Sequence, residues 1–145
     1  MTTAIDVAHY LLSLDDQNDG EGLSNLKLQK LCYYAQGFYL ALFDKPLFDE
    51  EIEAWAHGPV VPEVYHLFKV YGKAPIPVPD YPCTLTAEQQ GLVDEVYDVF
   101  GQYTAWKLRN MTHEEPTWNN HELAAETIPQ YEMQEYFKTR VNPNG

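Results

Sequence analysis

The sequence has few basic residues. Nine Lys and Arg stand against 22 Asp and Glu, which gives a net charge of −13, and no run of basic residues occurs anywhere in the chain. A chain of this charge repels nucleic acid, so we expect no direct nucleic-acid binding. Its field favours a basic protein partner and speeds the encounter with it, although a solvated acidic surface that serves only solubility is the commoner explanation.

Cysteine and long apolar runs are also scarce. The two cysteines, Cys32 and Cys83, lack CxxC spacing, so they give no zinc or redox signal and we expect no disulfide. No apolar run approaches the roughly 18 residues that are needed to span a bilayer. No Lys or Arg precedes Lys27, which is unlike a secretory leader. We therefore expect a cytoplasmic protein that does not enter a membrane.

The signatures of common catalytic sites are missing as well. The chain has no Gly-rich phosphate loop, no GxSxG nucleophile turn, and no Cys or Ser with an assignable base. These absences leave no recognisable site for a nucleotide or for a covalent intermediate. We therefore expect no cofactor.

The residues that are present suit one ordinary domain. The chain has 145 residues, of which 45% are hydrophobic and 21% charged, close to the averages for soluble globular domains. Eleven of its aromatic residues are Tyr, whose ring can be buried while its hydroxyl still finds a partner, so that Tyr suits both core edges and binding surfaces. We expect residues 1–145 to form a single compact domain.

Apolar residues at intervals of three and four predict a mainly α fold. Thr3 is placed to cap a first helix, which should end before Asp15, and Ser24 is placed to cap the next. Thr86 has the spacing of a capping box. In all we predict about six or seven helices, with one short β segment near residues 48–55, where apolar and acidic residues alternate.

The stretch RNMTHEEPTW, residues 109–118, holds the densest group of reactive side chains. His113 and Glu114 fit the first half of the zinc signature HExxH, but Thr117 stands where the second His is required. Pro116 also breaks the helix that would align the two ligands. We therefore expect no metal at this stretch.

Two interpretations of the same stretch stay open. His113 could act in acid–base catalysis if Glu114 or Glu115 raised the pKa of its imidazole and oriented the ring. The alternative function is therefore a small cytosolic enzyme or metal-dependent protein that uses His113 and Glu115. The structural interpretation, which we favour, is a corner in which Glu114 and Glu115 cover the exposed amides of the next helix and Trp118 packs on the core.

A second candidate patch lies in EAWAHGPVVPEVY, residues 53–65. Gly58 and two prolines fix a stiff turn there, and Trp55, His57 and Tyr65 offer rigid, partly polar side chains. Such a pattern is most often a packed corner. Rigid aromatic residues on a constrained turn nevertheless give a protein partner an anchor at low entropic cost.

Three motifs taken together are more specific than any one of them: LSNLKLQKLCYYAQGFYLALFDKPLF, EIEAWAHGPVVPEVYHLFKVYG and LRNMTHEEPTW. In this order and spacing, the chain resembles the Panacea antitoxin domain, the family of SocA-like and GepA-like phage-associated proteins, from about residue 4 to about residue 137. The third motif departs from the family pattern in residues 108–111, where relatives often have Leu-Ser before the Thr-His pair. It departs again in residues 116–117, where they have two prolines.

The resemblance implies a mainly helical domain without enzymatic activity, which neutralises a protein toxin by binding it in a two-gene toxin–antitoxin module. In the SocA-like branch, it also implies an adaptor that delivers the toxin to a cytosolic AAA+ protease. The residues that match the family motifs are Asn25, Leu26, Lys27, Leu28, Gln29, Lys30, Leu31, Tyr33, Tyr34, Ala35, Gln36, Trp55, Gly58, Pro59, Val60, Val61, Pro62, Val64, Tyr65, Thr112, His113, Glu115, Pro116 and Trp118.

Composition and resemblance together predict an antitoxin with an acidic, aromatic-rich face that binds a basic cognate toxin mole for mole. A specific interface of this kind buries on the order of 1,600 Å² in total. A phage-encoded scaffold or solubility factor without one tight partner is a further class to test against. The residues that we expect at the interface are Trp55, His57, Gly58, Pro59, Val60, Tyr65, His113, Glu115 and Trp118.

Overall fold

The computed structural model describes residues 2–78 and 80–141, and in those ranges it has seven α-helices and one two-stranded sheet. The mainly α fold and the number of helices predicted from the sequence are thereby confirmed. The elements in chain order are α1 (Ala4–Gln17), α2 (Asn25–Phe43), β1 (Glu53–Trp55), β2 (Gly58–Val60), α3 (Pro62–Phe68), the 3-10 helix η1 (Lys69–Tyr71), α4 (Ala87–Phe100), α5 (Ala105–Thr112), α6 (Pro116–Asn119), the 3-10 helix η2 (Glu122–Ala124) and α7 (Gln130–Arg140).

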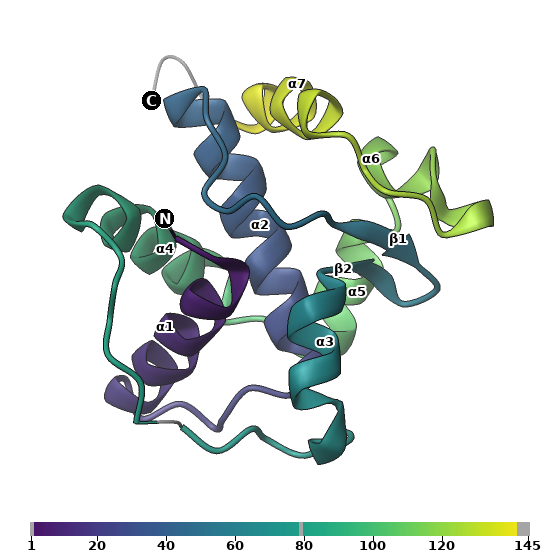
Figure 1. Cartoon of the computed structure of the whole chain (residues 1–145). Coiled ribbons are helices and arrows are strands. Elements are labelled where there is room, and N and C mark those ends of the chain that lie inside the picture. Colours follow the sequence, from purple (N-terminus) through teal and green to yellow (C-terminus); the bar gives the residue numbers. More distant parts are fainter. Residues whose placement is uncertain (1, 79, 142–145) are drawn as a thin grey trace.

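Helix α2 forms the centre of the molecule, and the other long helices lie around it (Figure 1). Helices α1, α3, α4, α5 and α7 contact it, as does strand β2. Every residue of α2 from Leu28 to Gly37 is buried. A helix that is buried on all sides is usually apolar all round, but this segment carries Gln29, Lys30 and Gln36. Buried polar groups require partners, so these side chains lead directly to the candidate site.

The helix starts agree with the capping residues predicted from the sequence. Thr3 and Thr86 each form a complete capping box, with reciprocal bonds to the third helical residue. The Ser24 hydroxyl accepts a hydrogen bond from the backbone N–H of Lys27 at 3.2 Å. These contacts satisfy backbone donors that the first turn of a helix leaves unpaired.

The predicted end of α1 was too early. The helix continues to Gln17, whereas the polar sequence suggested an end before Asp15. Asp15 is buried, because its carboxylate accepts hydrogen bonds from the backbone N–H of Gly22 at 2.9 Å and from the Tyr97 hydroxyl at 2.6 Å. A carboxylate with two donors from other segments can therefore occupy the inner face of the last turn.

The β segment predicted near residues 48–55 is a hairpin whose first strand, β1, starts at Glu53. Strands β1 and β2 are antiparallel, and their register pairs Glu53 with Val60, Ala54 with Pro59 and Trp55 with Gly58. The segment 126–128 lies along the other side of β1, with backbone bonds of 2.9 and 2.7 Å. An isolated two-stranded hairpin is marginally stable, so this segment and α2 hold it in place.

Helix α7 approaches α2 closely at Gly37. A Cβ atom at this position would lie 2.2 Å from Cε2 of the Phe137 side chain, which is fully buried. The absence of a side chain at Gly37 therefore sets the distance between the two helices. Among the described helices, none is both long enough and apolar enough to cross a membrane.

Candidate functional site

The third motif forms the corner between α5 and α6. Helix α5 ends at Thr112, His113 occupies its C-cap position, and Glu115 occupies the N-cap position of α6. Backbone bonds close the corner, including those from Glu115 N–H to the Thr112 carbonyl at 3.1 Å and from Trp118 N–H to the Glu115 carbonyl at 3.1 Å. The preferred interpretation of this stretch, a corner between two helices, matches the geometry.

The side chain of Glu115 does not cover the start of α6, as the sequence interpretation expected. It makes no capping bond and is buried, with 4% of its surface exposed. Its carboxylate accepts hydrogen bonds from the hydroxyls of Tyr33 at 2.6 Å and Tyr34 at 2.8 Å, and from Nη1 of Arg140 at 3.1 Å. These donors lie on α2 and α7, so the carboxylate connects the corner to both helices.

Burial controls the protonation of this buried network. It raises the pKa of Glu115, although the bonds from Tyr33, Tyr34 and Arg140 act in the opposite direction. It also raises the pKa of the Tyr33 hydroxyl, and the Glu115 carboxylate raises it further. The Tyr33 oxygen lies 2.6 Å from the Thr117 hydroxyl. Oε1 of Glu115 is bonded to Tyr33, and its Oε2 is bonded to Tyr34 and Arg140. Both carboxylate oxygens are therefore engaged in contacts that stabilise the fold.

His113 is not paired with a carboxylate in the part of the chain that the structure describes. Its ring stacks on the indole of Trp118, with centroids 3.9 Å apart and planes 5° apart, and its Nε2 is buried without a hydrogen-bond partner. Burial lowers the pKa of the imidazole, and Arg109 lowers it further. The alternative in which a neighbouring Glu raises this pKa is not supported, because the pKa is lowered and Glu115 faces the core. The His113–Glu115 pair invoked for the enzyme alternative is not formed.

The second and third motifs meet through their tryptophans. The indole N–H of Trp118 donates to the backbone carbonyl of Trp55 at 2.7 Å, which joins α6 to the hairpin. The Trp55 ring contacts the ring of Tyr65 edge to face at 5.0 Å, and its own N–H donates to Glu53 at 2.8 Å. Trp118 is 8% exposed, whereas Trp55 and Tyr65 are half-buried at the surface.

Several residues expected at the interface lie behind the surface instead. Gly58, Pro59 and Val60 are buried in β2, and Gly58 has a φ of +109°, which favours glycine. A Cβ atom there would lie 2.5 Å from Cε of Lys30 and 2.8 Å from the hydroxyl of Thr112. In this conformation, these residues support the surface at which the exposed His57 and the half-buried Trp55, Tyr65 and His113 lie.

The polar residues of α2 tie the hairpin and its entry to the core. The Gln29 side chain accepts from the Val61 N–H at 2.9 Å. The Gln36 carbonyl oxygen accepts from the Leu47 N–H at 2.8 Å, and its amide donates to the Phe48 carbonyl at 2.7 Å. Each glutamine thus satisfies backbone groups of a distant segment that would otherwise be buried unpaired.

Lys30 is the most unusual of these buried groups, and the sequence analysis did not single it out. Its ammonium is fully buried and donates to the Pro59 carbonyl at 3.0 Å. Burial lowers the pKa of this lysine to about 7, and the charge of Arg109 lowers it further. The signal for this site was a lysine followed directly by LCYYA, residues 31–35, a run without charged residues at the centre of the helix. Charged groups are rarely buried without an opposite charge.

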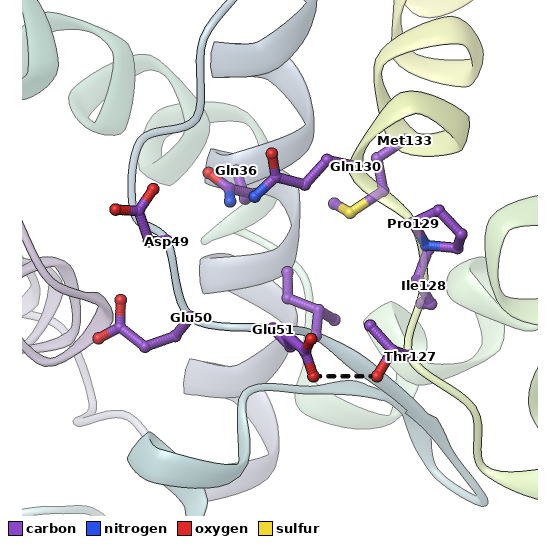
Figure 2. A pocket seen from close by; sticks show the side chains of 10 residues that line it. Gln36, Asp49, Glu50, Glu51, Thr127, Ile128, Pro129, Gln130 and Met133 are labelled. Carbon is purple, nitrogen blue, oxygen red and sulfur yellow. Dashed lines mark hydrogen bonds between the residues drawn. The ribbon is translucent and has the colours of Figure 1, made fainter.

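A cavity of about 260 Å³ opens between the segment before β1 and the start of α7 (Figure 2). Asp49, Glu50 and Glu51 lie on one side of it, and Pro129 and Met133 lie on the other. Two of these carboxylates are engaged within the chain: Glu50 accepts from the Ala4 N–H at 2.9 Å and Glu51 from the Thr127 hydroxyl at 3.1 Å. In the described residues, no group of three or more His, Cys, Asp or Glu is placed to hold a metal ion.

The comparison with protein families now identifies the class of protein. Residues 28–119 match the family described as "Antitoxin SocA-like, Panacea domain", a range that includes most of the first motif and all of the second and third. The chain belongs to this family, which confirms the resemblance read from the motifs.

A particular relative is also known. Over 50 residues, the chain is 48% identical to Antitoxin SocA of Caulobacter vibrioides (strain NA1000 / CB15N). The matched segment covers 34% of this chain and 27% of the relative, so the similarity spans about a quarter of the curated protein's length. No solved structure matches the chain.

Proposed function

We propose that this protein is an antitoxin that neutralises a cognate protein toxin by direct, stoichiometric binding. Membership of the SocA-like Panacea family over residues 28–119 is the observation that carries this proposal. The name of the relative, Antitoxin SocA, points in the same direction.

The geometry of the corner favours a binding role over an enzymatic one. The carboxylate of Glu115 is occupied by Tyr33, Tyr34 and Arg140, so it is not poised as a general base for a substrate. The ring of His113 is fixed by stacking on Trp118. Rigid aromatic residues that are supported from behind are well suited to a protein interface, because little side-chain entropy is lost on binding.

Growth rescue tests the proposal. The adjoining reading frame is expressed alone and then together with graded amounts of this protein, and both proteins are quantified. We expect toxicity from the neighbour alone, relief only near equal amounts, and co-purification of the two chains. Relief at strongly substoichiometric amounts would instead favour the enzyme alternative, and a harmless neighbour would remove the antitoxin proposal for that pair.

The level of the toxin distinguishes neutralisation by binding from delivery to a protease. If binding alone neutralises the toxin, its amount stays constant during rescue. If the protein also acts as an adaptor for a cytosolic AAA+ protease, the toxin disappears during rescue and persists when the protease is deleted. Measuring the toxin half-life in both strains separates the two modes.

A further inference from the structure

The two arginines of this chain have opposite environments. Arg140 donates to the buried carboxylate of Glu115 at 3.1 Å. Within residues 2–78 and 80–141, Arg109 makes no ion pair; its Nη1 donates to the side chain of the neighbouring Asn110 at 3.0 Å, and its Nε is buried without an acceptor. In a chain with 22 acidic residues against nine basic ones, an arginine without a carboxylate is unexpected.

The charge of Arg109 acts on two further basic groups, and neither has a carboxylate partner among the described residues. Lys30 is fully buried and donates to the Pro59 carbonyl, while Nε2 of His113 is buried without a partner. The charge of Arg109 lowers the pKa of both, after the larger effect of burial. Arg109, Lys30 and His113 therefore form a basic cluster in which, among the described residues, no carboxylate takes part.

The accessible part of this basic cluster resembles an interface hot spot. The guanidinium carbon of Arg109 lies 4.4 Å from the ring centroid of Trp106, whose side chain is 56% exposed. The exposed ring of His57 lies 6.3 Å from the same indole. An aromatic ring that supports a guanidinium keeps its fork of donors fixed for a bidentate ligand. Trp and Arg are also the residues most enriched in interface hot spots.

We propose that Arg109, supported by Trp106 and flanked by His57, is the anchor for a carboxylate of the toxin. The carboxylate belongs either to an Asp or Glu side chain or to the C-terminus of the partner. This inference rests on the proposed function, because it takes the partner to be a protein toxin. An acidic molecule repels carboxylates elsewhere on its surface, so one basic point fixes the orientation of the partner and adds specificity.

The anion site can be tested on the protein alone by nitrogen-15 NMR of the Arg Nε–H groups and the His rings. Sodium acetate is titrated at constant ionic strength against sodium chloride, with sodium phosphate as a third arm. We expect a saturable shift of the Arg109 and His113 signals in acetate. The signal of Arg140, whose carboxylate is internal, should not move. Equal shifts in chloride, a response to phosphate only, or no saturable shift would overturn the carboxylate site.

Toxin binding tests the same residue in the complex. Arg109→Gln should weaken the Kd for the toxin at least about tenfold, as expected for a hot-spot charge. Lys45→Gln, which removes one cation from an exposed pair with Glu88, is the matched control and should bind like wild type. Circular dichroism and the Tm of both variants establish that they are folded. An unchanged Kd for folded Arg109→Gln would overturn the inference.

A charge exchange identifies the partner group. Arg109→Glu should abolish binding to the toxin. Replacing the toxin residue that carries the contacting carboxylate with Arg should restore binding, and only this pair of substitutions should show an interaction free energy in a double-mutant cycle. The two proposals fail differently. If wild type neutralises the toxin and Arg109→Gln does so equally well, only the Arg109 anchor is overturned. If wild type does not bind the toxin, the antitoxin proposal fails, and so does the proposed contact between Arg109 and a toxin carboxylate. This holds even if the NMR titration shows that Arg109 binds acetate.

Discussion

At the scale of single residues, Glu115 joins parts of the chain that are far apart in sequence. Its donors Tyr33 and Tyr34 stand more than 80 positions earlier, and Arg140 stands 25 positions later. A buried carboxylate is costly unless such donors compensate it. The network therefore stabilises the corner between α5 and α6 only as a complete set.

Glu115→Ala should lower the free energy of unfolding by about 3 kcal/mol, because the buried hydroxyls of Tyr33 and Tyr34 and the guanidinium of Arg140 lose their acceptor. Urea unfolding followed by circular dichroism measures the change. Glu114→Ala is the matched control, since Glu114 is the exposed neighbour, and it should stay within about 0.5 kcal/mol of wild type. Similar losses in both variants would show that the buried network contributes no special stability.

Lys30 makes stability depend on pH in a defined direction. Its pKa in the folded protein is lowered to about 7 from a usual value of 10.5. Between these two values, the unfolded chain binds the proton of this lysine more tightly than the folded chain does. Stability contributed by this group therefore rises with pH across the window and falls as pH is lowered towards 7.

Lys30→Met should remove this dependence while keeping a similar volume in the core. We expect the difference in unfolding free energy, wild type minus variant, to increase steadily from about pH 7 to about pH 9.5. Chemical denaturation at each pH measures it, and the upper limit avoids the titration of tyrosines. A difference that stays flat with pH would mean that Lys30 keeps its ordinary pKa in the folded state.

At the scale of secondary-structure elements, the approach of α7 to α2 depends on Gly37. Gly37→Ala should destabilise the protein by about 2–3 kcal/mol, because the new Cβ would overlap Phe137 in a filled core. Gly91→Ala on α4 is the control, since nothing lies within 4 Å of a Cβ there, and it should stabilise by roughly 0.5–1 kcal/mol. Thermal unfolding of both variants is the measurement, and a neutral Gly37→Ala would show that α7 can move away.

The elements differ in how far the sequence could predict them. Helix starts at Thr3, Ser24 and Thr86 were predictable, because a cap is a contact between residues three positions apart. The end of α1 was not, because Asp15 is satisfied by Tyr97, 82 positions later. The burial of the Glu115 side chain was also missed, because its partners Tyr33, Tyr34 and Arg140 are distant in sequence. The family could be recognised because each of its motifs is a continuous stretch of sequence.

At the scale of the whole molecule, the acidic surface and the basic cluster around Arg109 would have different roles in the proposed complex with a toxin. A net charge of −13 acts over the range of the Debye length, roughly 10 Å at 0.1 M salt, and would speed the approach of a partner that is basic. The basic cluster would act only at contact, where the guanidinium of Arg109 and the proposed carboxylate of the partner exclude water. In the proposed complex, long-range attraction would therefore set the rate of association, and local contacts would set the orientation and the lifetime of the complex.

Salt should therefore change association with the toxin much more than dissociation. Raising the salt from about 0.1 M to about 1 M shortens the Debye length to roughly 3 Å and should slow association about tenfold or more. Stopped-flow fluorescence provides both rates. Lys45→Glu, which takes the net charge from −13 to −13 − 2 = −15, should associate faster than wild type at low salt and equally fast at high salt. An association rate that changes neither with salt nor with this substitution would rule out electrostatic steering of the toxin. The acidic surface would then serve solubility.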